Sequence, residues 1–413
     1  MEAKPLSRLA RWPVGPLAGW PVRSVRSVQP ARYIYHNNWR ASVAARHEPY
    51  MRRALRLACQ ALGDTSPNPL VGAVVVRHGR VVGQGYHRRA GLPHAEVEAL
   101  RQAGAQASGA ILYVTLEPCN HVGRTPPCVD AVIAAGIRHV VIAMRDPNPL
   151  TNGQGIARLR RAGVRVETGM LAEEARRLNE PFVKYITRKM PWVIAKVAQS
   201  LDGKIATRTG ESRWISSVAS RQLVHRLRRQ VDGIMVGVNT ILRDDPLLSA
   251  RSSARFARVD RPVKVIVDSH LRTPLSSRCL SASSPAPTMI ATTERSPTKR
   301  ASFERRGVEV LVVRAVKGRV PLRPVFRELA RRHQITSLLI EGGGEVLASA
   351  LSERLVDRLV WYVAPILIGG RTSPPAIGGE GISRLAEAVR LKDVVIRRVG
   401  PDVVWDAAVV YPQ

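Results

Sequence analysis

The chain has 413 residues and a formal net charge of +32 at pH 7, because it carries 64 Lys and Arg but only 32 Asp and Glu. This length predicts two or three domains. A composition of 45% hydrophobic and 23% charged residues excludes a wholly disordered or fibrous protein. No apolar run approaches the roughly 18 residues that cross a bilayer, which excludes a transmembrane protein. The positive charge suits an anionic partner, either nucleic acid or a phosphorylated small molecule, but a general arginine bias of the sequence explains it equally well.

Residues 1–46 differ from the rest of the chain. They are basic, contain Glu2 as their one acidic residue, and show scattered Trp, Pro and Ser without a sustained hydrophobic period, so we expect no folded unit there. Three interpretations are open: an organelle transit peptide, a nucleic-acid-binding arm, or an extension from a mis-assigned start codon. Four cysteines and the lack of a secretory signal indicate a reducing compartment. We expect a cytoplasmic protein.

From Glu48 onward the hydrophobic pattern predicts regular elements. A helix is expected over 48–62, followed by a hairpin of strands 71–76 and 81–86 that turns at His78-Gly79. The next expected elements are a helix at 94–103, a strand at 111–116, a helix at 128–135, strands at 140–144 and 164–167, and a polar helix at 171–179. Alternating strands and helices predict an α/β sandwich, which we assign to residues 47–190.

Pro191 opens a second set of apolar runs. These predict strands at 192–198, 233–238, 263–268, 308–313, 335–340 and 356–364. The stretch 272–298 is rich in Ser, Pro and Thr, so we expect a surface loop with one strand at 288–292 inside it. We therefore expect a second α/β domain over residues 191–413.

Four residues, His94, Glu96, Cys119 and Cys128, form the clearest candidate site. Pro93 suits a first helical turn, and both cysteines are expected beside a helix start, where the helix dipole and free N–H groups favour thiolate. One imidazole and two thiolates leave the fourth position of Zn²⁺ for water, as in catalytic zinc sites. Glu96 is then free to act as general acid and base, the role of the glutamate in zinc nucleobase deaminases. The alternative is a core histidine with two buried, unreactive cysteines.

The segment TLEPCNHVGRTPPC, residues 115–128, resembles a signature of the bifunctional deaminase/reductase family of riboflavin biosynthesis. Pro67-Asn68-Pro69 and His94-Ala95-Glu96 resemble the same family, and the resemblance runs from about residue 48 to the C-terminus. It implies a cytidine-deaminase-like α/β/α sandwich that deaminates 2,5-diamino-6-(5-phosphoribosylamino)pyrimidin-4(3H)-one. It further implies that the base and phosphate are held by Asn68, His87, His121 and Arg124. From the residues alone, Asn68 is equally a turn residue and Arg124 equally a solvated loop charge.

The second half resembles the reductase part of this family, which has a dihydrofolate-reductase-like fold. The similar motifs are Ser200-Leu201-Asp202-Gly203, Gly210-Glu211-Ser212, Asp244-Asp245-Pro246 and Glu341-Gly342-Gly343. From the residues alone, a strand followed by Glu341, three glycines and a helix indicates a phosphate cradle, although a helix start without a ligand has the same pattern. Glu345 departs from the small or neutral residues of such a turn, since its carboxylate would repel a phosphate unless it points outward.

The resemblance also implies that the second domain uses NADPH to reduce the opened ribosyl unit at C1, giving 5-amino-6-(5-phosphoribitylamino)uracil. The residues it places at NADPH are Ala198, Trp214, Thr240, Asp244, Ser269, Gly343, Gly344 and Glu345. Those it places at the substrate are Ser212, Arg228, Leu248, Arg251 and Glu341. We expect Lys196, Asp244 and Glu341 to be the catalytic polar side chains of the reduction. A structural ion pair between Lys196 and Asp244 is the alternative.

Two other functions compete with this one. A nucleic-acid-acting deaminase or RNA-binding protein would explain the charge, but such proteins interleave aromatic with basic residues, and aromatic residues make up only 5% of this chain. A family member that has kept one activity would lack a zinc ligand or Glu96, and these residues are all present. We therefore expect a phosphoribosylaminopyrimidine substrate, Zn²⁺ and NADPH as cofactors, a homo-oligomer, and neither nucleic acid nor a membrane as partner.

Overall fold

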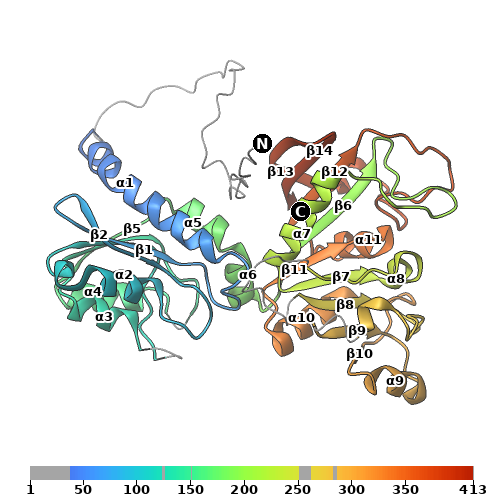
Figure 1. The fold of residues 1–413 in the computed structure, drawn as a ribbon, viewed down its shortest axis with the longest axis horizontal. Helices are drawn as coiled ribbons and strands as arrows, with labels where there is room; N and C mark the ends of the chain where they lie inside the picture. Colours follow the sequence, from blue (N-terminus) through green and yellow to red (C-terminus); the bar gives the residue numbers. More distant parts are fainter. Residues whose placement is uncertain (1–37, 123–125, 150, 251–261, 282–285, 413) are drawn as a thin grey trace, which may run out of the picture. The chain divides into compact units, whose positions relative to one another are not determined.

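The structure is a computed structural model that describes residues 38–122, 126–149, 151–250, 262–281 and 286–412 (Figure 1). These residues form two compact units. The first contains Pro69–Glu180 and the described part of Met1–Thr65, and the second contains Ser66–Asn68 and the described part of Pro181–Gln413. Within these residues, every helix is too short or too polar to cross a membrane.

A five-stranded sheet of order β2-β1-β3-β4-β5 forms the centre of the first unit. Its strands are β1 Gly72–Arg77, β2 Arg80–Tyr86, β3 Ile111–Leu116, β4 His139–Met144 and β5 Arg165–Thr168. Strand β1 is antiparallel to β2 and β3, whereas β3, β4 and β5 run parallel. The carboxyl ends of β3 and β4 therefore lie at one edge, the usual position of a ligand site in such sheets.

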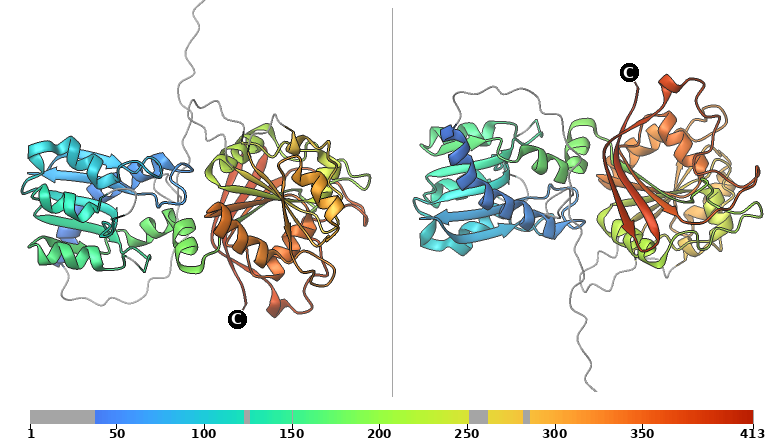
Figure 2. Two further views of the ribbon diagram at one scale, coloured as in Figure 1. Left: turned by 90° about the horizontal axis from the view of Figure 1, so that it is seen from below. Right: turned by 90° about the horizontal axis from the view of Figure 1, so that it is seen from above.

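Helices cover both faces of this sheet (Figure 2). On one face, α1 Asn38–Ala58 and α5 Ala172–Leu178 bury apolar side chains such as Leu55 and Leu178. On the other, α2 Ala95–Ala103, α3 Cys128–Ala134 and α4 Gln154–Arg161 bury side chains such as Ala99 and Val132. Short 3₁₀ turns, η1 Cys59–Ala61 and η2 Gly104–Ala107, follow α1 and α2. The predicted α/β sandwich is confirmed.

A nine-stranded sheet of order β10-β9-β8-β7-β11-β6-β12-β14-β13 forms the centre of the second unit. Its strands are β6 Trp192–Ser200, β7 Gly233–Gly237, β8 Val263–Val267, β9 Thr288–Thr292, β10 Glu309–Val312, β11 Ser337–Glu341, β12 Arg358–Ala364, β13 Arg390–Val399 and β14 Asp402–Val410. The seven strands from β10 to β12 in this order run parallel. The hairpin β13–β14 extends the sheet in antiparallel pairing.

Both faces of the second sheet are also covered. On one face, α10 Leu322–His333 and α11 Gly344–Ser352 contribute core residues such as Phe326 and Leu347. On the other, α7 Val218–Gln230 and α9 Pro297–Glu304 contribute Leu227 and Phe303. The remaining helical segments are α6 Glu180–Arg188, α8 Val238–Asp244, η3 Arg278–Leu280 and η4 Leu385–Glu387. A second α/β unit is thus confirmed.

Two predictions about the elements need correction. Helix α1 begins at Asn38, so residues 38–46, expected to be unfolded, are helical, and residues 1–37 lie outside the described residues. The hydrophobic period did not indicate this extension because α1 is polar at its start and contains Pro49. The stretch 272–298 contains the predicted strand β9, but it also holds η3 and the start of α9.

Candidate active sites

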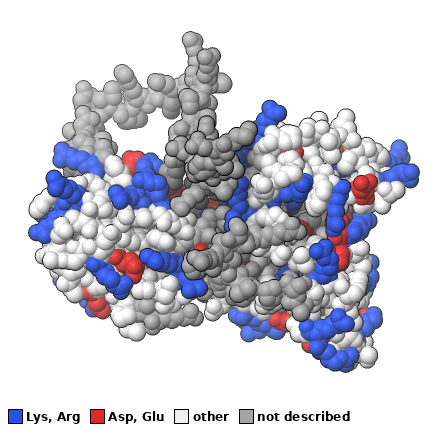
Figure 3. Space-filling view, viewed as in Figure 1, with Lys and Arg blue, Asp and Glu red and all other residues white. Residues whose placement is uncertain are grey.

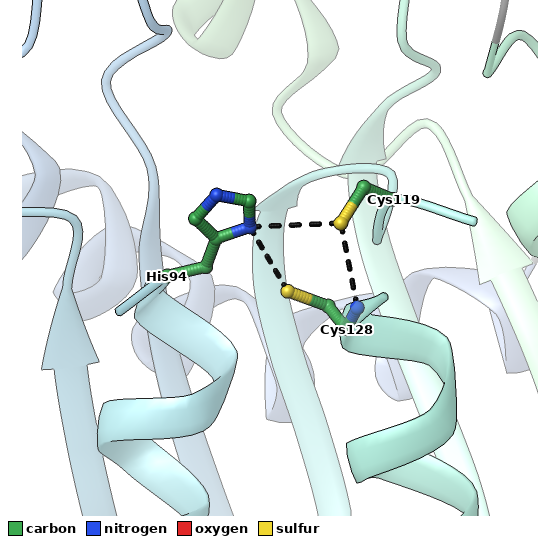
Figure 4. A group of neighbouring side chains, drawn as sticks. All are labelled: His94, Cys119 and Cys128. Atoms are coloured by element: carbon green, nitrogen blue, oxygen red, sulfur yellow. Dashed lines mark hydrogen bonds between the residues drawn. The ribbon is translucent and has the colours of Figure 1, made fainter. Parts of the chain in front are cut away.

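His94, Cys119 and Cys128 converge at one edge of the first sheet (Figure 4). His94 is the N-cap of α2, Cys119 lies in the turn after β3, and Cys128 is the first residue of α3. The Nδ1 atom of His94 lies 3.1 Å from the Sγ of Cys128 and 3.6 Å from the Sγ of Cys119. All three ligand atoms lie within 4.8 Å of one another. One nitrogen and two sulfur atoms at this spacing suit Zn²⁺ and leave a coordination position for water.

The three side chains shift one another's pKa. A hydrogen bond from Cys128 lowers the pKa of Cys119 to about 4, although burial opposes this shift. The bond with Cys119 and burial both raise the pKa of Cys128, and the bond with Cys119 raises the pKa of His94. The N–H of Cys128 also donates to the Sγ of Cys119 at 3.3 Å. Cys119 is therefore the thiol that ionises first, stabilised by the start of α3.

Glu96 and His87 lie beside this cluster. Glu96 is in the first turn of α2 and is 3% exposed. Burial, and then the negative charge of Cys119, raise its pKa to about 7. The His87 ring meets the His94 ring edge to face, with centroids 5.2 Å apart, and its Nδ1 lies 3.2 Å from the carbonyl oxygen of Pro93. Burial lowers the pKa of His87 and favours its neutral form.

The other residues predicted for the first site are placed differently. His121 is exposed, and its Nδ1 lies 3.4 Å from the Oγ1 of Thr151. Arg124 lies outside the described residues. Asn68 belongs to the second compact unit. The roles expected for these three residues stay predictions.

The second unit contains a cavity of about 500 Å³, toward the carboxyl ends of β6, β7 and β11. Most of the residues predicted for the reductase site line it: Lys196, Ala198, Ser212, Trp214, Arg228, Thr240, Asp244, Leu248, Glu341 and Gly343. Ser269, Gly344 and Glu345 do not line it, and Arg251 lies outside the described residues. The sheet order thus gathers side chains that are far apart in the sequence.

A buried ion pair forms one wall of this cavity. The Nε and Nη2 atoms of Arg228 donate to the two carboxylate oxygens of Glu341 at 2.7 Å each. Burial alone would raise the pKa of Glu341, but Arg228 and then Lys196 hold it below its ordinary value. Burial lowers the pKa of Lys196, which Glu341 partly counteracts. Asp244 instead accepts a hydrogen bond from Ser212 at 2.8 Å, and in the described part of the chain no ion pair joins it to Lys196.

The glycine turn after β11 closes another side of the cavity. Gly342 and Gly343 have φ values of +72° and +79°, which other residues adopt at a cost. Gly343 is the N-cap of α11, so free N–H groups at this helix start can bind a phosphate. A Cβ atom on Gly344 would lie 2.9 Å from the carbonyl oxygen of Pro375, so this residue packs against a neighbouring loop.

Glu345 does not face the cavity. Its carboxylate accepts hydrogen bonds from Arg319 at 2.9 Å and from the N–H of Gly379 at 3.2 Å. Arg319 supplies the charge opposite to this carboxylate, which reduces its repulsion of a phosphate at the glycine turn. The departure of Glu345 from a small or neutral residue is therefore compatible with a phosphate site.

Sequence reasoning missed a basic wall of the cavity, formed by Arg213, Arg221, Arg243 and Arg278. The guanidinium of Arg221 lies 4.4 Å from the ring centroid of Trp214. In a chain with 64 Lys and Arg residues, no single arginine carries a sequence signal. These cations, the glycine turn and the cavity volume fit NADPH and a phosphorylated substrate.

The chain is similar to two known families and to named proteins. Residues 44–144 match the cytidine and deoxycytidylate deaminase zinc-binding region, and residues 191–405 match the RibD C-terminal domain. The chain is 46% identical over 356 residues to the riboflavin biosynthesis protein RibD of Aquifex aeolicus, with 86% of this chain and 96% of that protein covered. It is 41% identical over 369 residues to the protein of that name in Escherichia coli, with 86% of this chain and 97% of that protein covered.

Solved structures show the same likeness. Acinetobacter baumannii RibD, form 1, has a TM-score of 0.80 and 36% identity, covering 89% of this chain and 99% of that one. A Thermotoga maritima structure, described as a diaminohydroxyphosphoribosylaminopyrimidine deaminase/5-amino-6-(5-phosphoribosylamino)uracil reductase, has a TM-score of 0.77 and 34% identity, covering 90% and 100%. The predicted deaminase-like and reductase folds are confirmed, as are zinc and NADPH as cofactors. The chain belongs to the RibD family of riboflavin biosynthesis proteins, bifunctional enzymes with a zinc-dependent deaminase domain and an NADPH-dependent reductase domain.

Proposed function

We propose that this enzyme converts 2,5-diamino-6-(5-phosphoribosylamino)pyrimidin-4(3H)-one into 5-amino-6-(5-phosphoribitylamino)uracil by deamination and then reduction. The activity named for the Thermotoga maritima relative supports this substrate class. The observation that carries the proposal is that each unit has its own set of reactive side chains: the His-Cys-Cys cluster with Glu96 in one, and the cavity with Lys196 and Glu341 in the other. We assign the deaminase to residues 47–190 and the reductase to residues 191–413.

In the deaminase domain, His94, Cys119 and Cys128 would hold zinc. Bound zinc makes hydroxide available near neutral pH by lowering the pKa of a water molecule. Glu96 would accept a proton from the attacking water and pass it to the amino group, so that the ring C–N bond breaks, a C–O bond forms and ammonia leaves. Asn68, His87, His121 and Arg124 hold the base and the phosphate.

In the reductase domain, bound NADPH would supply the hydride for C1 of the opened ribosyl unit, and a proton must reach the atom attached to C1. Lys196, Asp244 and Glu341 are the polar side chains at the reacting group, and Arg228 keeps the Glu341 carboxylate charged and fixed by two parallel hydrogen bonds. The remaining substrate contacts are Ser212, Leu248 and Arg251. The remaining cofactor contacts in the cavity are Ala198, Trp214, Thr240 and Gly343. Ser269, Gly344 and Glu345 do not line the cavity, so a contact between them and NADPH stays a prediction.

The positive charge serves phosphate-bearing small molecules rather than nucleic acid. On the face drawn in Figure 3, Lys and Arg side chains are spread among acidic and uncharged ones. A phosphate needs only a few placed donors, and the four arginines of the cavity wall supply them. The enzyme acts in the cytoplasm and has no membrane partner.

A second copy of the chain is the proposed macromolecular partner. Strand β13 is the last strand of its sheet, and its Val395 and Ile396 are 51% and 55% exposed. Trp405 of the adjacent strand β14 is 39% exposed. An edge strand with exposed apolar side chains pairs readily with another strand, and a twofold axis allows two identical edges to pair.

The proposed function is tested by incubating the purified protein with the diaminopyrimidine substrate, with and without NADPH, and identifying products by mass. Deamination is expected in both reactions and reduction only with NADPH. Glu96→Gln should keep its zinc, while deamination falls about hundred- to ten-thousand-fold, the usual effect of losing a general acid or base. Glu98→Gln changes a more exposed carboxylate of the same helix, paired with Arg101 at 2.7 Å, and should deaminate normally. Normal deamination by Glu96→Gln, or conversion of bases in an RNA pool by the wild type, would contradict the proposal.

A further inference from the structure

Glu117 is a buried carboxylate that the proposed chemistry does not use. It follows β3, lies two residues before Cys119, and is 3% exposed. Its Oε2 atom accepts hydrogen bonds from the N–H groups of Asp146 at 3.2 Å and Gly153 at 3.0 Å, and its Oε1 atom accepts one from Ile156 at 3.2 Å. A buried carboxylate with three backbone donors holds those donors in a fixed geometry.

Two of these donors belong to the start of α4. Gly153 is its N-cap and Ile156 lies in its first turn, where N–H groups have no partner within the helix. The positive end of the helix dipole also favours a carboxylate at this position. Glu117 therefore connects the turn after β3 to the start of α4.

The same turn contacts α4 on both sides of Cys119. On the preceding side, a Cβ atom on Gly155 would lie 2.2 Å from the carbonyl oxygen of Pro118, so the two backbones are in direct contact. On the following side, the Oδ1 atom of Asn120 accepts a hydrogen bond from Arg158 at 3.0 Å. Arg158 also pairs with Asp130 of α3, the helix that begins at Cys128. The backbone on either side of Cys119 is thus attached to α4.

We propose that Glu117 is a positioning residue of the metal centre, which attaches the Cys119 turn to α4 and so keeps the Cys119 sulfur close to Cys128 and His94. This inference rests on the proposed role of Cys119 as a zinc ligand. Glutamine would fill the same volume but has one acceptor oxygen, and its NH₂ group would face backbone donors. Replacing a residue that orients a metal ligand typically weakens metal binding about ten- to hundredfold.

The test compares Glu117→Gln with Glu173→Gln, an exposed glutamate of α5, in the full-length protein. Zinc affinity is measured by competition with a chromogenic chelator, and ligand geometry by the visible absorption of the cobalt-substituted protein. We expect about ten- to hundredfold weaker zinc binding and shifted cobalt bands for Glu117→Gln, and no change for Glu173→Gln. Unchanged affinity and unchanged bands, even with a lower unfolding temperature, would reduce Glu117 to a fold-stabilising residue and overturn the proposal.

Two further outcomes are decisive. If Glu117→Gln does not fold, Glu117→Asp keeps the charge but shortens the side chain, and it should also weaken zinc binding; wild-type affinity in that variant would overturn the proposal. A wild-type cobalt spectrum without sulfur-to-cobalt charge transfer would refute the ligand assignment, and this inference with it. None of these measurements uses the pyrimidine substrate, so a wrong substrate would leave their result unaffected.

Discussion

Replacing Arg228 by methionine should destabilise the second unit, because it leaves Glu341 buried without its counter-charge. Glu341 is 6% exposed and receives two hydrogen bonds of 2.7 Å from Arg228. Methionine retains much of the volume of arginine but carries no charge. Removing one partner of a buried ion pair costs about 3–5 kcal/mol, mainly because the other charge stays buried.

We expect the lower end of this range, about 3 kcal/mol, because Glu341 borders the cavity and Lys196 still acts on its charge. For a unit of this size, that loss corresponds to a fall in unfolding temperature of roughly 6–12 °C. Adding Glu341→Gln removes the unpaired charge, so the double variant should be more stable than the single one. Arg228→Met should also have a higher Michaelis constant than the wild type for the substrate of the reduction, since Arg228 lines the cavity.

The stability lost in Arg228→Met should also depend on pH. In the wild type, the pKa of Glu341 lies below its ordinary value. The pair therefore contributes stability above the ordinary glutamate pKa, and this contribution is lost as the pH falls through the lower pKa of the folded state. In Arg228→Met, burial instead favours the protonated carboxyl, so the single variant recovers stability on acidification. The difference between the two proteins should shrink toward acidic pH.

Tryptophan fluorescence during thermal unfolding measures this effect. Four of the seven tryptophans, Trp192, Trp214, Trp361 and Trp405, lie in the second unit, and the other three lie within residues 1–39. Arg229→Met, a change of an exposed neighbour in α7, is the matched control. If Arg228→Met were as stable as this control, or the double variant no more stable than Arg228→Met, the reasoning about the unpaired charge would be refuted.

The candidate zinc site could be predicted from the sequence because its residues lie in short local patterns. His94 and Cys128 each follow a proline at a helix start, and Cys119 lies in the turn after a strand of mostly buried residues, so the boundaries of three elements indicate where the side chains meet. The contacts of Glu117 that attach the Cys119 turn to α4 could not be predicted. The partners of Glu117 are backbone N–H groups, which any residue offers, and no sequence pattern distinguishes them.

The residues of the reductase cavity could be predicted only from the family resemblance, because they are far apart in the sequence. Arg228 and Glu341 are 113 positions apart and meet because β11 inserts between β7 and β6 in the sheet. The hydrophobic pattern indicates that β11 is a buried strand, but it carries no information about which strands are its neighbours. Helix α7 was missed because it is rich in polar and basic residues and buries few side chains, chiefly Val224 and Leu227. The sequence pattern therefore did not indicate that Arg228 lies on a helix beside Glu341.

Two further changes test the edge strand and the surroundings of Lys196. If the chain forms the proposed oligomer through β13, Val395→Asp should give a monomer in light scattering, whereas Val316→Asp, at a similarly exposed position, should leave the wild-type mass unchanged. A wild-type mass for Val395→Asp would refute the edge as the interface. Tyr362 lies beneath Lys196, whose Nζ is 5.8 Å from the ring centroid. Its hydroxyl is buried and, within the described residues, has no hydrogen-bond partner. Tyr362→Phe should therefore keep both stability and reduction, because it removes only that hydroxyl. Tyr362→Leu removes the attraction between ring and ammonium, worth up to about 2 kcal/mol when desolvated. Burial already lowers the pKa of Lys196, and losing the ring should lower it further. The alkaline limb of the pH–rate profile for reduction should then move to lower pH in Tyr362→Leu but not in Tyr362→Phe. Identical profiles for the two variants would show that the ring does not act on Lys196.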